Sequence, residues 1–193
     1  MRICLIRHGK TAANEKRLYC GATDEPLSPA GLEALKAQAV SRFYPDISGM
    51  RIYTSGLRRT EETLAAIYGD IPHSCLPGMR EMDFGKFEMH SYEELKEISE
   101  YIEWITDATG GYVCPGGESS NLFKERVFAA FDGLVASGGD AMVVCHGGVI
   151  AEIMARTFPD EGRNFYEWQP SAGCGYEISF EGGMAVGYKP IPQ

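Results

Sequence analysis

The sequence lacks the patterns that most directly reveal a location or a cofactor. No apolar run reaches the roughly 18 residues that a membrane-spanning helix requires. A strand-like segment follows Met1 directly, where a secretory signal would lie. The six cysteines form no CxxC pair and no zinc-ligand spacing, which predicts reduced thiols. We therefore expect a cytoplasmic protein without a membrane partner.

Positive charge is also scarce. The chain of 193 residues has 18 lysines and arginines against 27 acidic residues, a net charge of -9, which disfavours nucleic acid as a partner. A GxxxxGK(S/T) loop is absent, which excludes a P-loop nucleotide site, and no cluster of aspartates suggests a magnesium requirement. A small anionic substrate is compatible with this charge if cations converge locally.

The composition is that of an ordinary globular protein, 44% apolar and 23% charged, which predicts one α/β domain over residues 1–193. Strands are predicted over residues 1–6, 50–55, 73–76 and 141–145. Continuous apolar runs of this kind are typical of parallel strands that are buried on both faces. An antiparallel hairpin over residues 173–190 is expected to complete the sheet at its edge.

Helices connect these strands, and apolar spacing predicts which of their faces are buried. Ser28 as N-cap and Pro29 at the first helical position begin a helix that ends at Pro45. Its predicted buried face contains Leu32, Leu35, Ala39, Val40 and Phe43. A second helix, over residues 56–69, is expected to bury Leu57, Leu64 and Ile67.

Three more helices follow. Ser91 and Glu94 form a capping box for a helix over residues 92–108, a lid or flank of the site, whose predicted buried residues are Leu95, Ile98, Tyr101, Ile102 and Ile105. Ser119 or Ser120 begins a long helix that stops before Gly138. Its predicted buried residues are Leu122, Phe123, Val127, Phe131, Leu134 and Val135. A last helix covers residues 149–158.

Two histidines occupy the same position relative to a strand. His8 and His146 each follow a buried strand and each precede a glycine, which allows a sharp turn. In open α/β sheets, ligands bind outside the carboxyl ends of the strands. A single histidine is more often structural than catalytic, but two in equivalent positions favour a shared site between adjacent parallel strands.

Arginines lie at the ends of two strands, those over residues 1–6 and 50–55. Arg7 directly precedes His8, and Arg58 and Arg59 lie in the first turn of the helix over residues 56–69. Cations are unfavourable at the amino end of a helix, and a bound anion would remove this conflict. The alternative is a pair of solvated arginines, which the position after a strand end makes less favourable.

Arginines and imidazoles that converge would form a cationic pocket suited to a phosphoryl group. A neutral imidazole can attack phosphorus directly to form a phosphohistidine, while a carboxylic acid protonates the leaving oxygen and then activates water. Glu81, in the acidic loop over residues 79–89, is the candidate for that carboxylic acid. The alternative is a solvated carboxylate in a turn.

Five segments, in the order LIRHGKTAAN, TSGLRRTEET, REMDFGKFE, PGGES and VVCHGG, resemble the defining motifs of the histidine phosphatase (phosphoglycerate mutase-like) superfamily. The resemblance implies a three-layer α/β/α sandwich with a mostly parallel central sheet, and a reaction without a metal ion or other cofactor. It implies that His8 is the phosphorylated nucleophile and Glu81 the proton donor.

The resemblance also assigns the binding residues. It implies that the phosphoryl group is bound by Arg7, Arg59 and His146, and that the substrate site includes Asn14, Gly21 and Gly147. Arg59 is selected over Arg58 because the family's arginine lies four residues after the serine that Ser55 matches. Lys10 departs from the glutamate or glutamine that is usual in the family, and lies either at the pocket rim or in solvent.

Finer features are similar to the α-ribazole phosphatases of this superfamily. They are LYCGATDEPLS, FEM at residues 87–89, and the late pair Gly173 and Cys174. This similarity implies α-ribazole 5'-phosphate, an intermediate in assembly of the cobalamin nucleotide loop, or a similar small phosphorylated metabolite as substrate. The alternatives are a phosphoglycerate mutase and a regulatory protein that binds phosphate without turnover. Only 64 residues separate Glu81 from His146. The phosphoglycerate mutases have an insertion there with extra basic residues for a second phosphate, so the resemblance favours a monophosphate hydrolase over the mutase.

Overall fold

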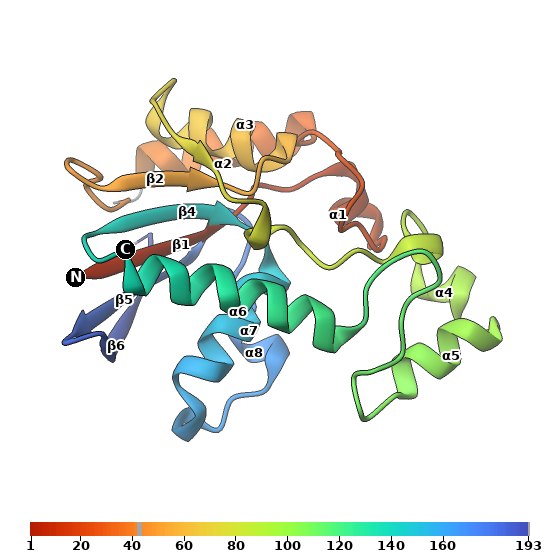
Figure 1. The fold of residues 1–193 in the computed structure, drawn as a ribbon. Helices are drawn as coiled ribbons and strands as arrows, with labels where there is room; N and C mark the ends of the chain where they lie inside the picture. Colours follow the sequence, from red (N-terminus) through yellow and green to blue (C-terminus); the bar gives the residue numbers. More distant parts are fainter. Residues whose placement is uncertain (42–43, 193) are drawn as a thin grey trace.

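The computed structural model describes residues 1–41 and 44–192 and contains a sheet of six strands in the order β3-β2-β4-β1-β5-β6 (Figure 1). The strands are β1 (Arg2–Arg7), β2 (Arg51–Thr54), β3 (Ser74–Cys75), β4 (Ala141–Cys145), β5 (Gly175–Glu181) and β6 (Met184–Ile191). The pairs β3–β2, β2–β4 and β4–β1 are parallel, whereas β5 is antiparallel to both β1 and β6. The predicted mostly parallel sheet with an antiparallel edge hairpin is confirmed.

Helices cover both faces of this sheet. The helices of the described residues are α1 (Ala12–Lys16), α2 (Pro29–Ser41), α3 (Arg58–Tyr68), α4 (Tyr92–Leu95), α5 (Ser99–Thr106), α6 (Ser120–Ala136), α7 (Gly147–Thr157) and α8 (Phe165–Trp168). Short 3-10 turns are η1 (Pro77–Met79), η2 (Gly85–Phe87) and η3 (Pro159–Glu161). Figure 1 shows α2 and α3 on one side of the sheet and α6, α7 and α8 on the other, which confirms the three-layer sandwich. No helix in the described ranges is long and apolar enough to cross a membrane.

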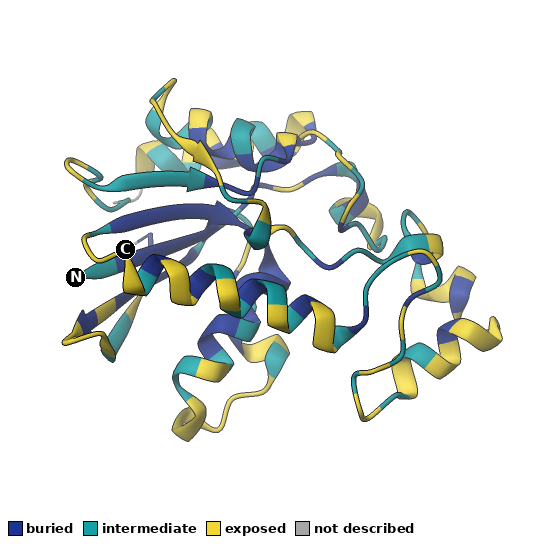
Figure 2. Ribbon diagram, viewed as in Figure 1, coloured by how far each residue is buried: buried dark blue, intermediate teal, exposed yellow. Residues whose placement is uncertain are grey.

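Alternate residues of β1 pack against opposite helical layers. Ile3 and Leu5 belong to a cluster that includes the apolar faces of α6 and α7. Cys4 and Ile6 belong to a smaller cluster with Met142 of β4. These four central side chains of β1 are all buried, as expected for a strand covered on both faces (Figure 2). Packing on both sides therefore holds the strand whose end carries His8.

Three of the predicted helix starts are confirmed by their caps. Ser28 Oγ accepts the amide N–H of Gly31 at 2.9 Å, and Ser119 caps α6 in the same way. Ser91 and Glu94 form the predicted capping box, at the start of α4. Local side-chain chemistry thus determines where these helices begin.

Two of the predicted buried faces include a wrong residue. Val40 of α2 is 90% exposed, and Leu122 of α6 is exposed as well. Val40 lies five residues after the buried Leu35, and Leu122 lies five residues before the buried Val127. At about 3.6 residues per turn, a separation of five residues points a side chain away from the buried face. Phe43 lies outside the described residues.

The predicted single helix over residues 92–108 is wrong, because α4 and α5 are separate helices. The exposed side chains there include Ile98, Ile102 and Ile105. Tyr101 is fully buried instead, with its hydroxyl 2.6 Å from that of Tyr19 and its ring packed against Trp104. Aromatic rings bury more apolar area than isoleucine, so the chain turns its aromatic side inward. In Figure 1, α4 and α5 project from the main body as a flank.

Candidate active site

The candidate site lies at the carboxyl ends of β1 and β4. Because these strands are parallel neighbours with Arg7 opposite Cys145, the residues that follow them start side by side. The His8 amide donates to the carbonyl of Cys145 at 3.0 Å. The imidazole centroids of His8 and His146 are 5.1 Å apart. The topology thus brings together the two histidines that the sequence places in equivalent positions.

The turn after β1 orients the His8 ring. Its Nδ1 lies 2.7 Å from the carbonyl oxygen of Gly9. Because a carbonyl oxygen only accepts hydrogen bonds, Nδ1 carries the proton of the neutral imidazole. The Gly9 amide donates to Oγ1 of Thr63 at 2.9 Å, which anchors the turn to α3. Nε2 of His8 therefore keeps its lone pair, as a nucleophile requires.

Hydroxyl groups before and within α3 orient the second imidazole. Nε2 of His146 lies 2.9 Å from Ser55 Oγ, which is 3.1 Å from Thr60 Oγ1. The Thr60 hydroxyl donates to the carbonyl of Leu57 at 2.7 Å. Ser55 therefore donates to Thr60 and accepts from the Nε2–H of His146. This arrangement leaves Nδ1 of His146 as the ring nitrogen available to a ligand.

Both imidazoles are neutral in this environment. Burial lowers the pKa of His8 to about 3, with a further contribution from the positive charges of Arg59 and Arg7. Burial and the same charges lower the pKa of His146 well below its usual range. The neutral form of His8 is therefore present throughout the physiological pH range.

The lowered pKa values predict that stability decreases in acid. Unfolded histidine has a pKa of about 6.5, so below that pH the unfolded chain binds a proton that folded His8 excludes until about pH 3. We expect chemical denaturation in phosphate-free buffer to give a lower free energy of unfolding at about pH 5 than at about pH 7. The difference should shrink in His8→Asn. An identical difference in the variant would contradict a lowered pKa of His8.

Two arginines reach the site from different elements. Arg7 ends β1, and its Nη1 donates to the carbonyl of Pro170 at 2.8 Å. Arg59, in the first turn of α3, is fully buried. Its Nη2 donates to the carbonyl of Gly21 at 2.6 Å, and its Nη1 donates to that of Thr23 at 2.7 Å. These contacts fix both guanidinium groups before any ligand binds.

Arg58 differs from its neighbour. Its side chain is 61% exposed and forms a 3.2 Å ion pair with Glu62, one turn later on α3. The burial of Arg59 and the exposure of Arg58 agree with the selection of Arg59 as the phosphate ligand. Lys10 is also exposed.

Unpaired nitrogen atoms are the strongest sign of a ligand at this site. Across residues 1–41 and 44–192, three buried side-chain polar atoms have no hydrogen-bond partner. They are Nε of Arg7, Nε of Arg59 and Nδ1 of His146. An unpaired buried polar group costs about 1–3 kcal/mol, so native structures retain few of them. Phosphoryl oxygens are acceptors that would pair with the two guanidinium N–H groups.

Glu81 completes the site from the loop between η1 and η2. Its Oε2 accepts the amide N–H of Gly148 at 2.9 Å, and its Oε1 accepts that of Met82 at 3.1 Å. Burial raises the pKa of Glu81 above its usual range, although these hydrogen bonds and the charge of Arg7 oppose the shift. A carboxyl group with a raised pKa is suited to act as an acid and then as a base.

Two glycines at the start of α7 permit this close approach. A Cβ atom on Gly148 would lie 2.5 Å from Oε1 of Glu81. A Cβ atom on Gly147 would lie 2.8 Å from Nε2 of Gln169 and 3.1 Å from Cζ of Arg7. Larger residues would displace the carboxyl group or the guanidinium, so the small size of both residues is a requirement of the site.

Asn14 and Gly21 lie at the first loop of the site. Asn14 forms a capping box with Thr11, the N-cap of α1. Its Oδ1 accepts the amide N–H of Thr11 at 3.1 Å, and this contact uses only the oxygen of the side chain. The Gly21 amide donates to the Glu88 carboxylate at 3.0 Å, as do the next two amides of the chain. Gly21 therefore contributes to the site through its carbonyl, which holds Arg59.

Sequence reasoning missed the hydroxyl groups that hold His146 and the turn at Gly9 in place. Ser55 and Thr60 orient His146, and Thr63 anchors the turn at Gly9. All three hydroxyl residues are buried. Their signal was a cluster of serine and threonine around a predicted buried helix face, where hydroxyl groups need partners.

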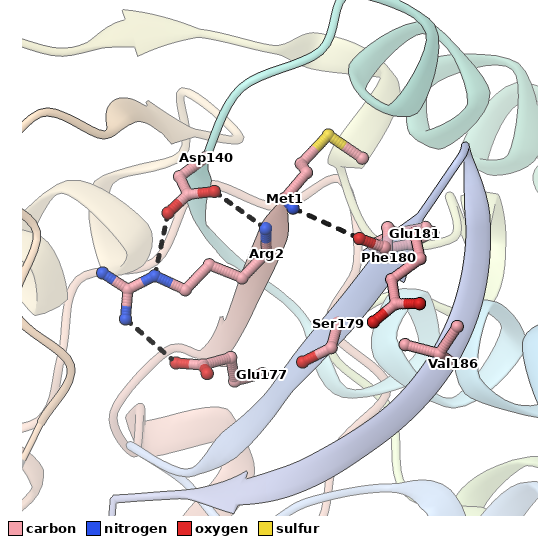
Figure 3. A pocket seen from close by; sticks show the side chains of 8 residues that line it. All are labelled: Met1, Arg2, Asp140, Glu177, Ser179, Phe180, Glu181 and Val186. Carbon is pink, nitrogen blue, oxygen red and sulfur yellow. Dashed lines mark hydrogen bonds and ion pairs between the residues drawn. The ribbon is translucent and has the colours of Figure 1, made fainter.

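A separate pocket lies at the opposite end of β1 (Figure 3). It has a volume of about 370 Å³, and its charged side chains are Arg2, Asp140, Glu177 and Glu181. Arg2 is already paired with Asp140 at 2.9 Å and with Glu177 at 3.5 Å. Three carboxylates outnumber Arg2 and the amino group of Met1, which makes this pocket unfavourable for an anion. No cluster of three metal-ligating side chains occurs among the described residues.

Known proteins resemble this chain over nearly its whole length. A model of the histidine phosphatase superfamily (branch 1) matches residues 3–186. The adenosylcobalamin/alpha-ribazole phosphatase of Salmonella typhimurium is 30% identical over 193 residues, which cover 96% of this chain and 94% of that protein.

Solved structures agree with this relationship. The alpha-ribazole phosphatase from Shigella flexneri has a TM-score of 0.80 at 29% identity, covering 96% of this chain and 93% of that one. The phosphoglycerate mutase from Thermus thermophilus has a TM-score of 0.73 at 26% identity, covering 97% and 98%. The family match, together with the paired histidines and buried arginines of the site, places this chain in branch 1 of the histidine phosphatase superfamily.

Proposed function

We propose that this chain hydrolyses phosphate monoesters through a phosphohistidine on His8, without a metal ion, and that Glu81 is the general acid and base. The observation that carries the proposal is that the three unpaired buried nitrogens all belong to residues around the His8 imidazole. Membership of a phosphatase superfamily supports the class of reaction.

In the first step, Nε2 of His8 attacks phosphorus, so that an N–P bond forms as the ester P–O bond breaks. The carboxyl group of Glu81 gives its proton to the leaving oxygen, and the alcohol departs. Arg7 and Arg59 stabilise the charge on the phosphoryl oxygens. When a phosphoryl oxygen carries a proton, Nδ1 of neutral His146 accepts a hydrogen bond from it, because the Nε2–H of His146 is already bound to Ser55.

In the second step, water attacks the phosphohistidine and the N–P bond breaks. The Glu81 carboxylate accepts the proton of that water, and inorganic phosphate leaves. His8 returns to the neutral tautomer with its proton on Nδ1, where the Gly9 carbonyl accepts it. The cycle consumes one water and returns Glu81 to its protonated form, so it needs no further reactant.

Glu81→Gln tests the acid role through the leaving group. We expect kcat/KM to fall about 100-fold or more for alkyl phosphates, whose oxygen needs a proton, and much less for p-nitrophenyl phosphate. The ratio kcat/KM is the correct measure because it covers substrate binding and formation of the phosphohistidine, but not the later hydrolysis of the phosphohistidine. Glu33→Gln, at an exposed residue of α2 paired with Lys36, is the control and should change neither value. Equal slowing of both substrates would remove Glu81 from this role.

The proposed substrate is α-ribazole 5'-phosphate or a similar small phosphate. The relatives named alpha-ribazole phosphatase support this choice. The leaving group would lie against segments 15–25 and 86–115. Tyr19 and Trp104 of these segments pack their rings against each other and against the ring of Phe84, which belongs to the loop that carries Glu81.

The test of this proposal is phosphate release in the presence of EDTA. The panel contains α-ribazole 5'-phosphate, 3-phosphoglycerate, common sugar phosphates and p-nitrophenyl phosphate. We expect α-ribazole 5'-phosphate to have a kcat/KM that exceeds the others by orders of magnitude. Loss of activity in EDTA would contradict the metal-independent mechanism. Transfer between phosphoglycerate positions without release of phosphate would favour a mutase instead.

A further inference from the structure

We infer that Arg126 and Glu118 form a clamp that positions Glu81 for proton transfer to the leaving group. We name this pair the Arg126–Glu118 clamp. Its side chains form hydrogen bonds to the backbone of the loop over residues 78–83. Both residues are positioning residues, since neither is assigned a contact with the substrate. The inference rests on the proposed role of Glu81 as general acid.

Every N–H group of the Arg126 guanidinium is used. Its Nη1 donates to the carbonyls of Gly78 at 3.0 Å and Arg80 at 2.9 Å, and its Nη2 donates to that of Glu81 at 3.3 Å. The remaining two N–H groups, on Nε and Nη2, donate to the two carboxylate oxygens of Glu118 at 2.9 and 2.8 Å. Only arginine offers five donors in a planar fork, so lysine cannot replace this set of contacts.

Glu118 binds the same loop at the backbone of Asp83. Its Oε2 accepts the amide N–H of Asp83 at 3.1 Å, and its own amide donates to the Asp83 carbonyl at 2.9 Å. Gly117 lies so close to this segment that a Cβ atom would be 2.3 Å from the Asp83 carbonyl oxygen. Glu118 belongs to the PGGES segment, which the proposed reaction otherwise leaves without a role.

The Glu81 residue is thus fixed at both ends. Its backbone carbonyl is bound by Arg126, while its carboxylate is bound by the amides of Gly148 and Met82. Arg126 projects from α6, which packs on the sheet, so the clamp ties a loop to a rigid element. Proton transfer requires a donor at hydrogen-bond distance from the leaving oxygen, and a displacement of about 1 Å can cost about 100-fold in rate.

The test compares two substrates in Arg126→Met, which keeps most of the aliphatic stem and removes the fork. We expect kcat/KM to fall about 10- to 100-fold for an alkyl phosphate and by less than about threefold for p-nitrophenyl phosphate. Glu118→Gln should shift the ratio of the two values in the same direction. The retained aryl phosphatase activity reports that the variants are folded.

Arg156→Met is the matched control. Arg156 forms a similar two-point ion pair with Asp132, and its guanidinium lies over the ring of Phe128, but it does not contact the Glu81 loop. Its loss should leave the ratio of alkyl to aryl activity unchanged. A general loss of stability would lower both activities together in either variant.

The double variant Arg126→Met with Glu81→Gln separates positioning from structure. If Arg126 acts through Glu81, the double variant should show no larger leaving-group effect than Glu81→Gln alone. Additive effects, or equal slowing of both substrates by Arg126→Met and Glu118→Gln, would overturn the clamp. If Arg126→Met does not fold, Glu118→Gln decides alone. Absence of a leaving-group effect in Glu81→Gln itself would instead overturn the proposed function.

Discussion

Replacing His8 with alanine is expected to lower kcat by about 1000-fold or more, because the variant cannot form the covalent intermediate. The remaining ligands stay in place, since Arg7, Arg59 and His146 are held by carbonyl and hydroxyl groups that do not involve His8. The variant should therefore still bind inorganic phosphate. Phosphate release and calorimetric phosphate binding measure the two properties separately.

His73→Ala is the matched control for this variant. His73 is paired with Glu61 at 2.6 Å near the sheet edge, and neither residue belongs to the site. Exposed pairs of this kind contribute about 0–1 kcal/mol to stability, so turnover should stay close to that of the unmodified protein. Substantial turnover by His8→Ala, with the fold intact by circular dichroism, would show that the nucleophile is elsewhere.

Arg59→Ala is the second variant with a large expected effect. A buried, preorganised charge that acts on the transition state contributes about 3–4 kcal/mol, which corresponds to a loss of about 100- to 1000-fold in kcat/KM. The loss has two sources, because Arg59 also holds the loop at Gly21 and Thr23 through their carbonyls. Phosphate release from p-nitrophenyl phosphate measures the effect without the contribution of the leaving-group proton.

Arg58→Ala is the natural control, since the two arginines are adjacent in α3. Arg58 is exposed and its guanidinium pairs with Glu62, so its loss should change kcat/KM by less than about threefold. A loss below tenfold in Arg59→Ala, with a larger loss in Arg58→Ala, would exchange the roles of the two residues.

The position of the site could be predicted because it depends on strand ends. Residues 1–6 and 141–145 are continuous apolar runs, and the histidines follow them directly. The order of strands is a different matter, since β1 and β4 are far apart in the sequence and no local pattern makes them neighbours. The equivalent positions of His8 and His146 allowed that contact to be predicted from chemistry.

The choice between Arg58 and Arg59 needed more than helical spacing. Both lie in the first turn of α3, and only the resemblance to a known family selected Arg59. The structure supplies the physical reason, because the carbonyls of Gly21 and Thr23 hold one guanidinium inside while Glu62 pairs with the other outside. These carbonyls come from a distant loop that sequence patterns do not place.

Two features lay beyond sequence reasoning because they depend on partners distant in the chain. In the segment predicted as one helix over residues 92–108, Tyr101 is buried against Tyr19, which comes from the first loop. Arg126 binds backbone carbonyls, and because every residue has a carbonyl, the residue types do not indicate which ones are bound. Residues in such contacts appear in the sequence only as a charge on a helix.

Trapping the phosphorylated enzyme tests the central claim most directly. Protein mixed with substrate is quenched in alkaline denaturant, which preserves the N–P bond, and then measured by intact mass and peptide mapping. We predict a mass increase of one phosphoryl group, located on His8, that is absent from His8→Ala and accumulates in Glu81→Gln with an aryl phosphate. A phosphoryl group on another residue, or turnover with no trapped intermediate in any variant, would contradict the account.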